Sequence, residues 1–198
     1  MGWYEYFARQ GHAVYLPDQV SRARSGFNVT LLNEVAAGTR SPTELPTVLV
    51  LTKAASWESF RFGPSLGTAF PGEQFPVEAI DALAAQSIPD QNAEFNPPAV
   101  NLTPTRLAQL ADTIGGAVLV GHSESGFYPE DAALQNPAGL RGLVSIEPAS
   151  CQSGLGSVTG GGSTPLSPTQ IAKLAKIPTL VVFGDHIDDA SRTSVARD

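Results

Sequence analysis

The sequence predicts an α/β protein built on a mainly parallel β-sheet. Near-continuous apolar runs, which are typical of strands buried on both faces, alternate along the chain with segments of helical periodicity. A helix between two consecutive strands connects parallel neighbours, so helices are expected on both faces of the sheet. With 198 residues, of which 42% are hydrophobic and 16% charged, the chain is long enough to bury the core of one domain.

The first helix and strand of this alternation lie at the start of the chain. Residues 2–10 place aromatic side chains on one side of a short helix, which Gly11 ends. The apolar run HAVYLPD at 12–18 then predicts a buried strand. Helix followed by strand is the order that an α/β sheet requires.

Three more pairs of helix and strand follow in the second half of the chain. Pro104, Pro129 and Pro168 each suit the first turn of a helix, and Thr103 and Ser167 are suitable N-caps. The predicted pairs are a helix at 103–113 with a strand at 117–123, a helix at 129–135 with a strand at 140–148, and a helix at 169–176 with a strand at 179–185.

The segment from about 26 to 100 does not follow this alternation. It carries most of the prolines and several aromatic residues, with one clear helical pattern after Pro76. Its length far exceeds the roughly 2 to 6 residues of a usual connection between helix and strand. We therefore interpret 26–100 as a cap or lid inserted into a single domain that spans 1–198. Residues 46–55 are ambiguous between strand and helix, and the Gly-, Ser- and Pro-rich stretch at 157–168 predicts a surface loop.

The composition argues against several classes of function. A formal net charge of −7 without a basic cluster argues against a nucleic-acid partner. No window approaches the roughly 20 apolar residues of a membrane-spanning helix, and the first 20 residues lack the basic start and apolar core of an export signal. A nucleotide-binding α/β domain would need a G-x-G-x-x-G or G-x-x-x-x-G-K-[ST] turn after a strand, and the sequence has neither.

The run VLVGHSESGF at 118–127 leads into a serine with small neighbours. A strand that ends on such a serine and is followed by glycine and a helix is a nucleophile elbow, in which the residues two before and two after the serine must be small. Gly121 and Ser125 meet this requirement around Ser123, although Ser125 departs from the strict G-x-S-x-G pattern. The alternative is an ordinary glycine-containing turn after a strand, which carries no chemistry.

Several segments together resemble one family. The stretch LPDQVSRARSG at 16–26 is similar to a strand-end segment of many α/β-hydrolases, with Ser21 and Ala23 where glycines are usual. More specifically, nearly the whole chain resembles the Alcaligenes-type bacterial esterases of that superfamily. This implies an α/β-hydrolase fold with Ser123 as the nucleophile. The segments that carry the resemblance are MGWYEYF at 1–7, FRFGP at 60–64, FPVEA at 75–79, PPAVNL at 97–102, HSESGFYP at 122–129, SIEP at 145–148 and VVFGDHI at 181–187.

The resemblance also implies the position of the catalytic acid. In this subgroup the acid is a Glu just after the strand that follows the elbow, which matches Glu147. A Glu directly before Pro148 at a strand end has no obvious use in packing, although it could be a solvated acid at the sheet edge. The carboxyl ends of parallel strands lie at one edge of a sheet, so Asp185 at the end of the next strand and Asp188 in the loop after it are alternatives.

The general base is the open question of this site. A serine hydroxyl needs a base, usually histidine, and the chain contains His12, His122 and His186. His12 is expected at the start of a strand at the opposite edge of the sheet, and His122 should point away from the reactive side of Ser123. His186 lies on the correct edge, but in the family the base follows a further strand near the C-terminus. We therefore expect the base beyond Asp198 and the chain to be incomplete at both ends.

These expectations combine into a serine carboxylic-ester hydrolase that works through an acyl-enzyme and needs no metal or cofactor. The backbone N–H of Glu124 is the one oxyanion-hole donor that can be located. The aromatic residues of the cap favour a fairly apolar small-molecule ester as substrate. The alternative is a non-catalytic protein that keeps the fold and lacks the base. The resemblance also implies that the full-length protein can be an exported one.

Overall fold

The computed structural model describes residues 2–26, 28–45, 52–87, 102–148 and 166–184. The chain divides into two compact units, Met1–Asn101 and Leu102–Asp198. The second unit contains the sheet and both residues that the sequence assigns to the reaction, Ser123 and Glu147. The predicted cap at 26–100 falls within the first unit, and its role as a cap stays a prediction.

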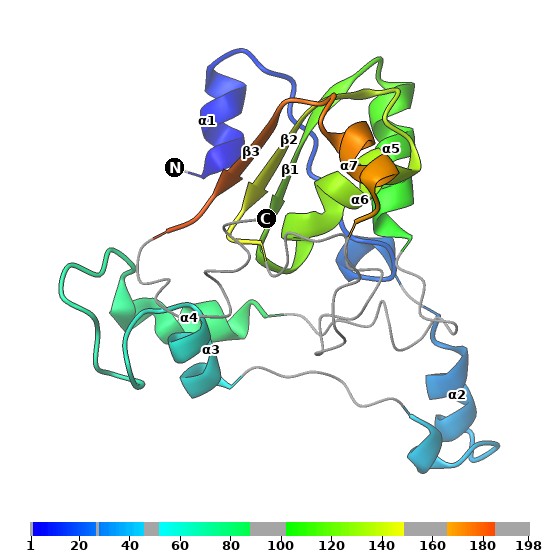
Figure 1. Ribbon diagram of the computed structural model, residues 1–198. Helices are drawn as coiled ribbons and strands as arrows, with labels where there is room; N and C mark the ends of the chain where they lie inside the picture. Colours follow the sequence, from blue (N-terminus) through cyan, green and yellow to red (C-terminus); the bar gives the residue numbers. More distant parts are fainter. Residues whose placement is uncertain (1, 27, 46–51, 88–101, 149–165, 185–198) are drawn as a thin grey trace. The chain divides into compact units, whose positions relative to one another are not determined.

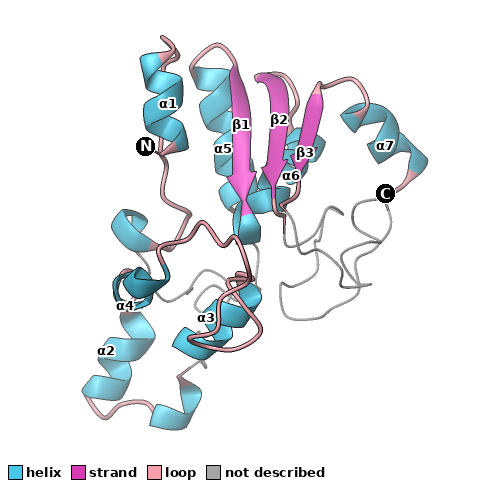
Figure 2. Ribbon diagram, turned by 90° about the vertical axis from the view of Figure 1, so that its left-hand side faces the viewer, coloured by secondary structure: helices cyan, strands magenta, loops and turns pink. Residues whose placement is uncertain are grey.

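The second unit is built on three parallel strands in the order β1-β2-β3 (Figure 2). The strands are β1 (Ala117–His122), β2 (Leu140–Ile146) and β3 (Thr179–Val182), as the apolar runs predict. Leu119 is paired with Leu143, and Val144 is paired with Leu180. Because the strands are parallel, the carboxyl ends of β1, β2 and β3 meet at one edge of the sheet.

Three helices of this unit lie on the same side of the sheet (Figure 1). They are α5 (Thr103–Thr113), α6 (Tyr128–Gln135) and α7 (Pro168–Leu174), and each has proline in its first turn. Helix α7 begins at a capping box, in which Ser167 Oγ accepts from the Gln170 N–H at 3.3 Å and Gln170 Oε1 accepts from the Ser167 N–H at 2.9 Å. Helix α5 already includes Thr103, so the residue before its first turn is Leu102.

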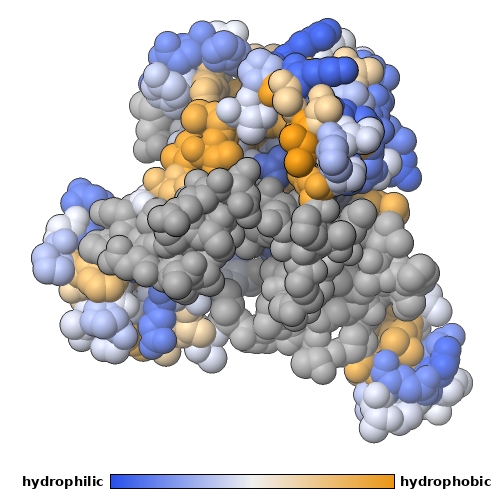
Figure 3. All heavy atoms as spheres, viewed as in Figure 1, coloured by the Kyte–Doolittle hydropathy of each residue, from blue (hydrophilic) through white to orange (hydrophobic). Residues whose placement is uncertain are grey.

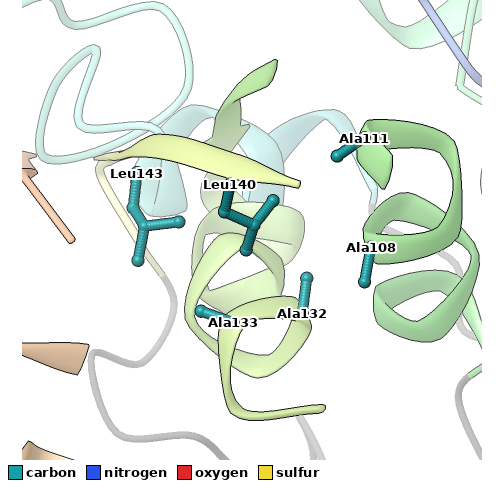
Figure 4. Close-up of a cluster of buried hydrophobic side chains, with 6 residues drawn as sticks. All are labelled: Ala108, Ala111, Ala132, Ala133, Leu140 and Leu143. Atoms are coloured by element: carbon teal, nitrogen blue, oxygen red, sulfur yellow. The ribbon is translucent and has the colours of Figure 1, made fainter. Parts of the chain in front are cut away.

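Small side chains allow the helices to approach the sheet closely (Figure 4). Ala111 of α5 and Ala132 and Ala133 of α6 are completely buried, and Leu143 of β2 is 1% exposed. Leu119 of β1 packs against this cluster from the same face of the sheet. The alternation of side chains along β1 and β2 therefore directs one set of apolar residues into a core shared with α5 and α6.

The opposite face of the sheet is also apolar. Val118 and Val120 of β1 are 55% and 47% exposed, and Leu180 of β3 is 56% exposed. Hydrophobic side chains gather over β3 in the space-filling view (Figure 3). Within this unit the described helices pack on one face only, and the other face carries the valine and leucine side chains that a two-sided cover would bury.

The first unit is helical in its described part. An aromatic cluster forms its best-buried region: the rings of Trp57 and Phe62 meet edge to face at 5.8 Å, and Phe62 stacks on Phe75 at 4.0 Å. Trp57 is 2% exposed, and its Nε1–H donates to the Thr68 carbonyl at 3.2 Å. The helices are α1 (Trp3–Arg9), α2 (Thr30–Ala36), α3 (Lys53–Ser59) and α4 (Ile80–Ala85), with short 3-10 helices at Ala23–Ser25, Pro42–Glu44 and Val77–Ala79.

Two expectations for the first unit have clear outcomes. The helix after Pro76 is confirmed, as the 3-10 turn and α4 together. The strand expected at 12–18 is wrong: the described residues of this segment have no regular structure, and Tyr15 and Leu16 are 57% and 61% exposed. A strand needs a hydrogen-bonded partner, and no described strand pairs with this segment.

Some predicted features lie outside the described residues. These are residues 46–51 of the ambiguous segment and residues 157–165 of the predicted surface loop. Across the described parts of both units, none of the helices has the length and apolar character needed to cross a membrane.

Candidate active site

Ser123, the predicted nucleophile, directly follows the last residue of β1. Its φ angle is 54°, which lies in the left-handed region that a serine rarely adopts. The chain then turns into a 3-10 helix, η4 (Ser123–Phe127), which continues without a break as α6. The helix was expected to restart only at Pro129, so the structure shows a smoother transition from strand to helix. A strained residue between a parallel strand and a helix is the backbone geometry of a nucleophile elbow.

Two neighbours of Ser123 explain how the local sequence forms this turn. The Ser125 hydroxyl donates to the His122 carbonyl at 2.9 Å and accepts from the His122 N–H at 3.3 Å, which closes the turn around Ser123. A Cβ atom on Gly121 would lie 2.2 Å from the Ser125 carbonyl oxygen and 2.9 Å from Pro129 Cδ. Position 121 must therefore be glycine, whereas position 125 accommodates a serine whose hydroxyl stabilises the turn.

Glu147, the predicted acid, lies in a second strained turn. It follows the last residue of β2, and its φ angle is 45°. Its backbone N–H donates to the Val182 carbonyl of β3 at 2.8 Å, and its carboxylate accepts a hydrogen bond from the backbone N–H of Gly184. Main-chain and side-chain atoms of Glu147 are thus both held by the end of β3, which limits the positions that the carboxylate can take.

The two strained turns are in direct contact. A Cβ atom on Gly126 would lie 2.4 Å from Pro148 Cα and 2.6 Å from Pro148 Cβ. Gly126 belongs to η4, and Pro148 directly follows Glu147. The segment that begins at Ser123 and the segment that contains Glu147 can therefore pack together only because position 126 has no side chain.

The negative charge of Glu147 also acts on His122. Partial burial lowers the pKa of the His122 imidazole below its usual range, and the negative charge of Glu147 partly opposes this shift. His122 is paired with Ile146 in the sheet and is an exposed residue of β1. Its imidazole is therefore within the electrostatic range of Glu147, while the expectation that it points away from the reactive side of Ser123 stays a prediction.

The remaining candidate residues belong to η4, to the first unit or to parts of the chain that are not described. Glu124 is half-buried in η4, immediately after Ser123, where an oxyanion-hole N–H is expected. His12 belongs to the first unit, and its ring meets Phe7 edge to face at 6.2 Å. The predicted strand start at His12 is wrong, because residues 12–18 form no strand. Asp185, His186 and Asp188 lie outside the described residues. Among the described side chains, no group of three or more His, Cys, Asp or Glu could hold a metal ion.

Sequence reasoning did not identify the supporting residues of this site. The contact of Gly126 with Pro148 and the bond from Gly184 to Glu147 join residues that lie far apart in the chain. The HSxSGxYP and SxEP motifs contain Gly126 and Pro148, so both positions were visible as parts of a pattern. The pattern contained no signal that the two residues touch.

Comparison with known proteins identifies the relationship. No protein-family model matches the chain. A solved structure described as a novel bacterial esterase is 37% identical in sequence and has a TM-score of 0.84, covering 100% of this chain and 58% of the esterase. The chain is related to the α/β-hydrolase esterases. A second relative, the probable secreted lipase phiG of Fungal sp. (strain ATCC 74256), is 30% identical over 150 residues.

These relatives confirm the predicted α/β-hydrolase fold and the esterase-type resemblance. The aligned region is 75% of this chain but 38% of the fungal lipase, and the chain covers 58% of the esterase structure. The chain thus spans less than two thirds of either relative. The three described strands form a parallel sheet, and Ser123 directly follows strand β1.

Proposed function

We propose that this chain carries the nucleophile and the acid of a serine carboxylic-ester hydrolase. In this proposal Ser123 is the nucleophile, Glu147 is the acid, and the backbone N–H of Glu124 is one donor of the oxyanion hole. The relationship to an esterase and to a probable lipase supports hydrolysis of a carboxylic ester. Both relatives extend beyond the matched region, so the assignment of activity to this protein is our proposal.

One observation carries the assignment of residues. Ser123 and Glu147 both adopt left-handed backbone angles, at the ends of neighbouring parallel strands, and Gly126 packs directly against Pro148 beside Glu147. Backbone strain of this kind costs of order 1–3 kcal/mol per residue and concentrates at functional sites. Strain at both predicted residues therefore supports their assignment to one functional site, in which the surrounding packing maintains the strained backbone.

The proposed reaction has two steps. The Ser123 hydroxyl attacks the ester carbonyl carbon while a general base accepts its proton, and the tetrahedral oxyanion receives a hydrogen bond from the Glu124 N–H. The carbon–oxygen bond to the alcohol breaks, the alcohol leaves with the proton, and an acyl group stays on Ser123. Water then hydrolyses this acyl-enzyme and releases the acid. Glu147 orients the imidazole of a histidine that acts as this base, and His186 is one candidate for it.

Turnover of a short-chain p-nitrophenyl ester by the full-length protein tests this proposal. We expect the Ser123→Ala variant to lose at least about a thousandfold in kcat, because removal of the nucleophile leaves only the weak catalysis of the remaining site. Ser59→Ala, the same change at an exposed serine at the end of α3, is the matched control and should keep full activity. Equal turnover by the parent protein and Ser123→Ala would exclude Ser123 as the nucleophile, and folded protein without any turnover would support the non-catalytic alternative.

We also propose that the ester substrate is fairly apolar. The many aromatic residues of the segment 26–100 support this proposal. We expect a higher kcat/KM for p-nitrophenyl esters with an acyl chain of several carbons than for the acetate. A strict preference for the acetate would contradict this assignment. The description of the fungal relative as secreted supports export of this protein as well.

A further inference from the structure

A buried carboxylate that the proposed reaction does not use lies beneath the active-site turns. Glu130, in the first turn of α6, is only 6% exposed. Its Oε1 accepts a hydrogen bond from Ser145 Oγ at 3.2 Å, and its Oε2 is buried without a hydrogen-bond partner among the described residues. Burial of a carboxyl group with one oxygen unsatisfied is costly, so an apolar residue would be the more stable choice if this position only filled space.

The position of Ser145 connects this carboxylate to both predicted catalytic residues. Ser145 has no exposed surface and lies in β2, two residues before Glu147. In the sheet it is paired with Gly121, which lies two residues before Ser123. The hydrogen bond from Ser145 to Glu130 therefore lies close to the carboxyl ends of both strands. Strand β1 leads into the nucleophile Ser123 there, and strand β2 leads into the acid Glu147.

Glu130 belongs to the helix that continues from the nucleophile. The start of α6 rests on Gly121, where a Cβ atom would lie 2.9 Å from Pro129 Cδ. Because Gly121 has no side chain, no side-chain contact at this position fixes α6 on the sheet, and the helix packs closely on the backbone of β1. The Glu130–Ser145 hydrogen bond is the directional contact between α6 and β2 at this level.

We infer that Glu130 is a positioning residue, whose hydrogen bond with Ser145 sets the helix that follows Ser123 against the strand that ends before Glu147. This inference rests on the proposed esterase function. Displacement of α6 along the sheet would move Ser123 relative to Glu147, and a misplacement of about 1 Å can cost roughly a hundredfold in rate. Buried polar contacts of this type provide specific geometry in place of added stability.

The variant Glu130→Met tests this role. Methionine has a similar volume and is apolar, so it removes the hydrogen bond and also the buried unsatisfied oxygen. We expect the melting temperature to stay the same or to rise, KM for a p-nitrophenyl ester to stay unchanged, and kcat to fall about tenfold or more. Glu130→Gln keeps an oxygen that can accept from Ser145, so its kcat should recover most of this loss.

Two controls make the outcome specific. Asp131→Leu removes the next carboxylate along α6, which is 7% exposed but makes no hydrogen bond to β2 in the described structure, and should keep the parent kcat. Ser145→Ala should reproduce the fall in kcat, and the double variant Ser145→Ala/Glu130→Met should fall no further because both changes remove the same bond.

Each result has one interpretation. Parent kcat in Glu130→Met, or equal losses in the Met and Gln variants, would overturn the positioning role while the Ser123→Ala result still supports the esterase. If Ser123→Ala turns over as fast as the parent protein, both the proposed reaction and the positioning role are excluded. A loss of kcat that follows a matching loss of melting temperature would show that Glu130 acts only in folding.

Discussion

At the scale of single residues, strain and close approach mark the proposed site. The described non-glycine residues with left-handed φ angles are Ser21, Ala23, Arg61, Ser123 and Glu147. A non-glycine residue pays roughly 1–2 kcal/mol for this conformation. At Ser123 and Glu147 the proposed chemistry requires a side chain, so glycine cannot replace these residues and the strain energy of the left-handed conformation remains. At Ser21 and Ala23 no such requirement exists, and α/β-hydrolases commonly have glycine at the similar positions.

Replacement of Ala23 by glycine should stabilise the protein. The φ angle of Ala23 is 49°, so glycine removes the steric strain, although it also increases the entropy of the unfolded chain. We expect a net gain of up to about 1 kcal/mol in the free energy of unfolding, measured by denaturant titration. Ala37→Gly is the matched control, because Ala37 has a φ angle of −78° and should lose about 0.5–1 kcal/mol. A loss in both variants would contradict the strain at Ala23.

Replacement of Gly126 by alanine should damage the proposed active site. The added methyl group would lie 2.4 Å from Pro148 Cα, so the turn after Ser123 and the turn at Glu147 must move apart. We expect a loss of about 1–3 kcal/mol in stability and a fall in kcat toward p-nitrophenyl esters. Gly142→Ala in β2 is the control, because its new Cβ would have no neighbour closer than 3.5 Å. Unchanged kcat in Gly126→Ala would show that the contact with Pro148 does not position the site.

At the scale of secondary-structure elements, the two units use different kinds of core. In the second unit, alanines of α5 and α6 pack closely on the leucines of β2. In the first unit, helix α3 buries Trp57, whose ring packs against Phe62. Helix α3 has 7 residues and would not be stable alone, so this aromatic packing supplies part of its stability.

Truncation of this aromatic cluster should destabilise the first unit. Trp57→Ala removes a large buried ring and its hydrogen bond to the Thr68 carbonyl, so we expect a loss of about 3–5 kcal/mol in the free energy of unfolding. Phe60→Ala, at a ring that is 44% exposed, should cost much less. Denaturant titration compares the two variants. Far-ultraviolet circular dichroism is the signal to follow, because tryptophan fluorescence changes when Trp57 is removed. Similar losses in the free energy of unfolding would contradict the expectation that the buried Trp57 ring contributes more stability than the exposed Phe60 ring.

At the scale of the whole molecule, acidic residues dominate the charge, and two of those in the described ranges are buried. The formal net charge is −7, and Glu130 and Asp131 are 6% and 7% exposed. Burial raises the pKa of Glu130 from its ordinary value of 4.5 to about 7, with a further increase from the charge of Asp131 and a decrease from the Ser145 hydrogen bond. Burial also raises the pKa of Asp131 from 3.8 to about 6.

These raised pKa values predict how stability depends on pH. The folded state holds both protons more tightly than the unfolded chain, so this stabilisation is fully present below about pH 4 and is lost as pH rises through about 7. For Glu130 the loss amounts to about 3 kcal/mol. We therefore expect Glu130→Gln to gain stability relative to the parent protein as pH rises from 4.5 to 7.5, measured by denaturant titration at each pH.

Asp112→Asn, at an exposed position of α5, is the control for the removal of a surface carboxylate. Its stability relative to the parent protein should change little over the same pH range. A constant difference between Glu130→Gln and the parent protein would contradict the raised pKa of Glu130.

Much of the second unit could be predicted from sequence because its signals are local. Prolines and caps marked the helix starts, apolar runs marked β1, β2 and β3, and the GHSESG pattern marked the turn at Ser123. The similarity to esterases was visible in short motifs for the same reason. The segment at 12–18 has the same apolar composition as a strand, but composition does not indicate whether a partner strand lies beside it.

Tertiary structure alone decided how the residues around the candidate site contact one another. The contact of Gly126 with Pro148, the bond from Gly184 to Glu147 and the burial of Glu130 against Ser145 each join separate elements of the fold. Sequence periodicity reports which face of its own helix or strand a residue occupies, and it contains no information about the element opposite. For this reason local sequence was sufficient for most elements and the motif residues. Only the packing of α6 on β1 and β2, together with the pairing of β2 with β3, defines the contacts that hold Ser123 and Glu147 in place.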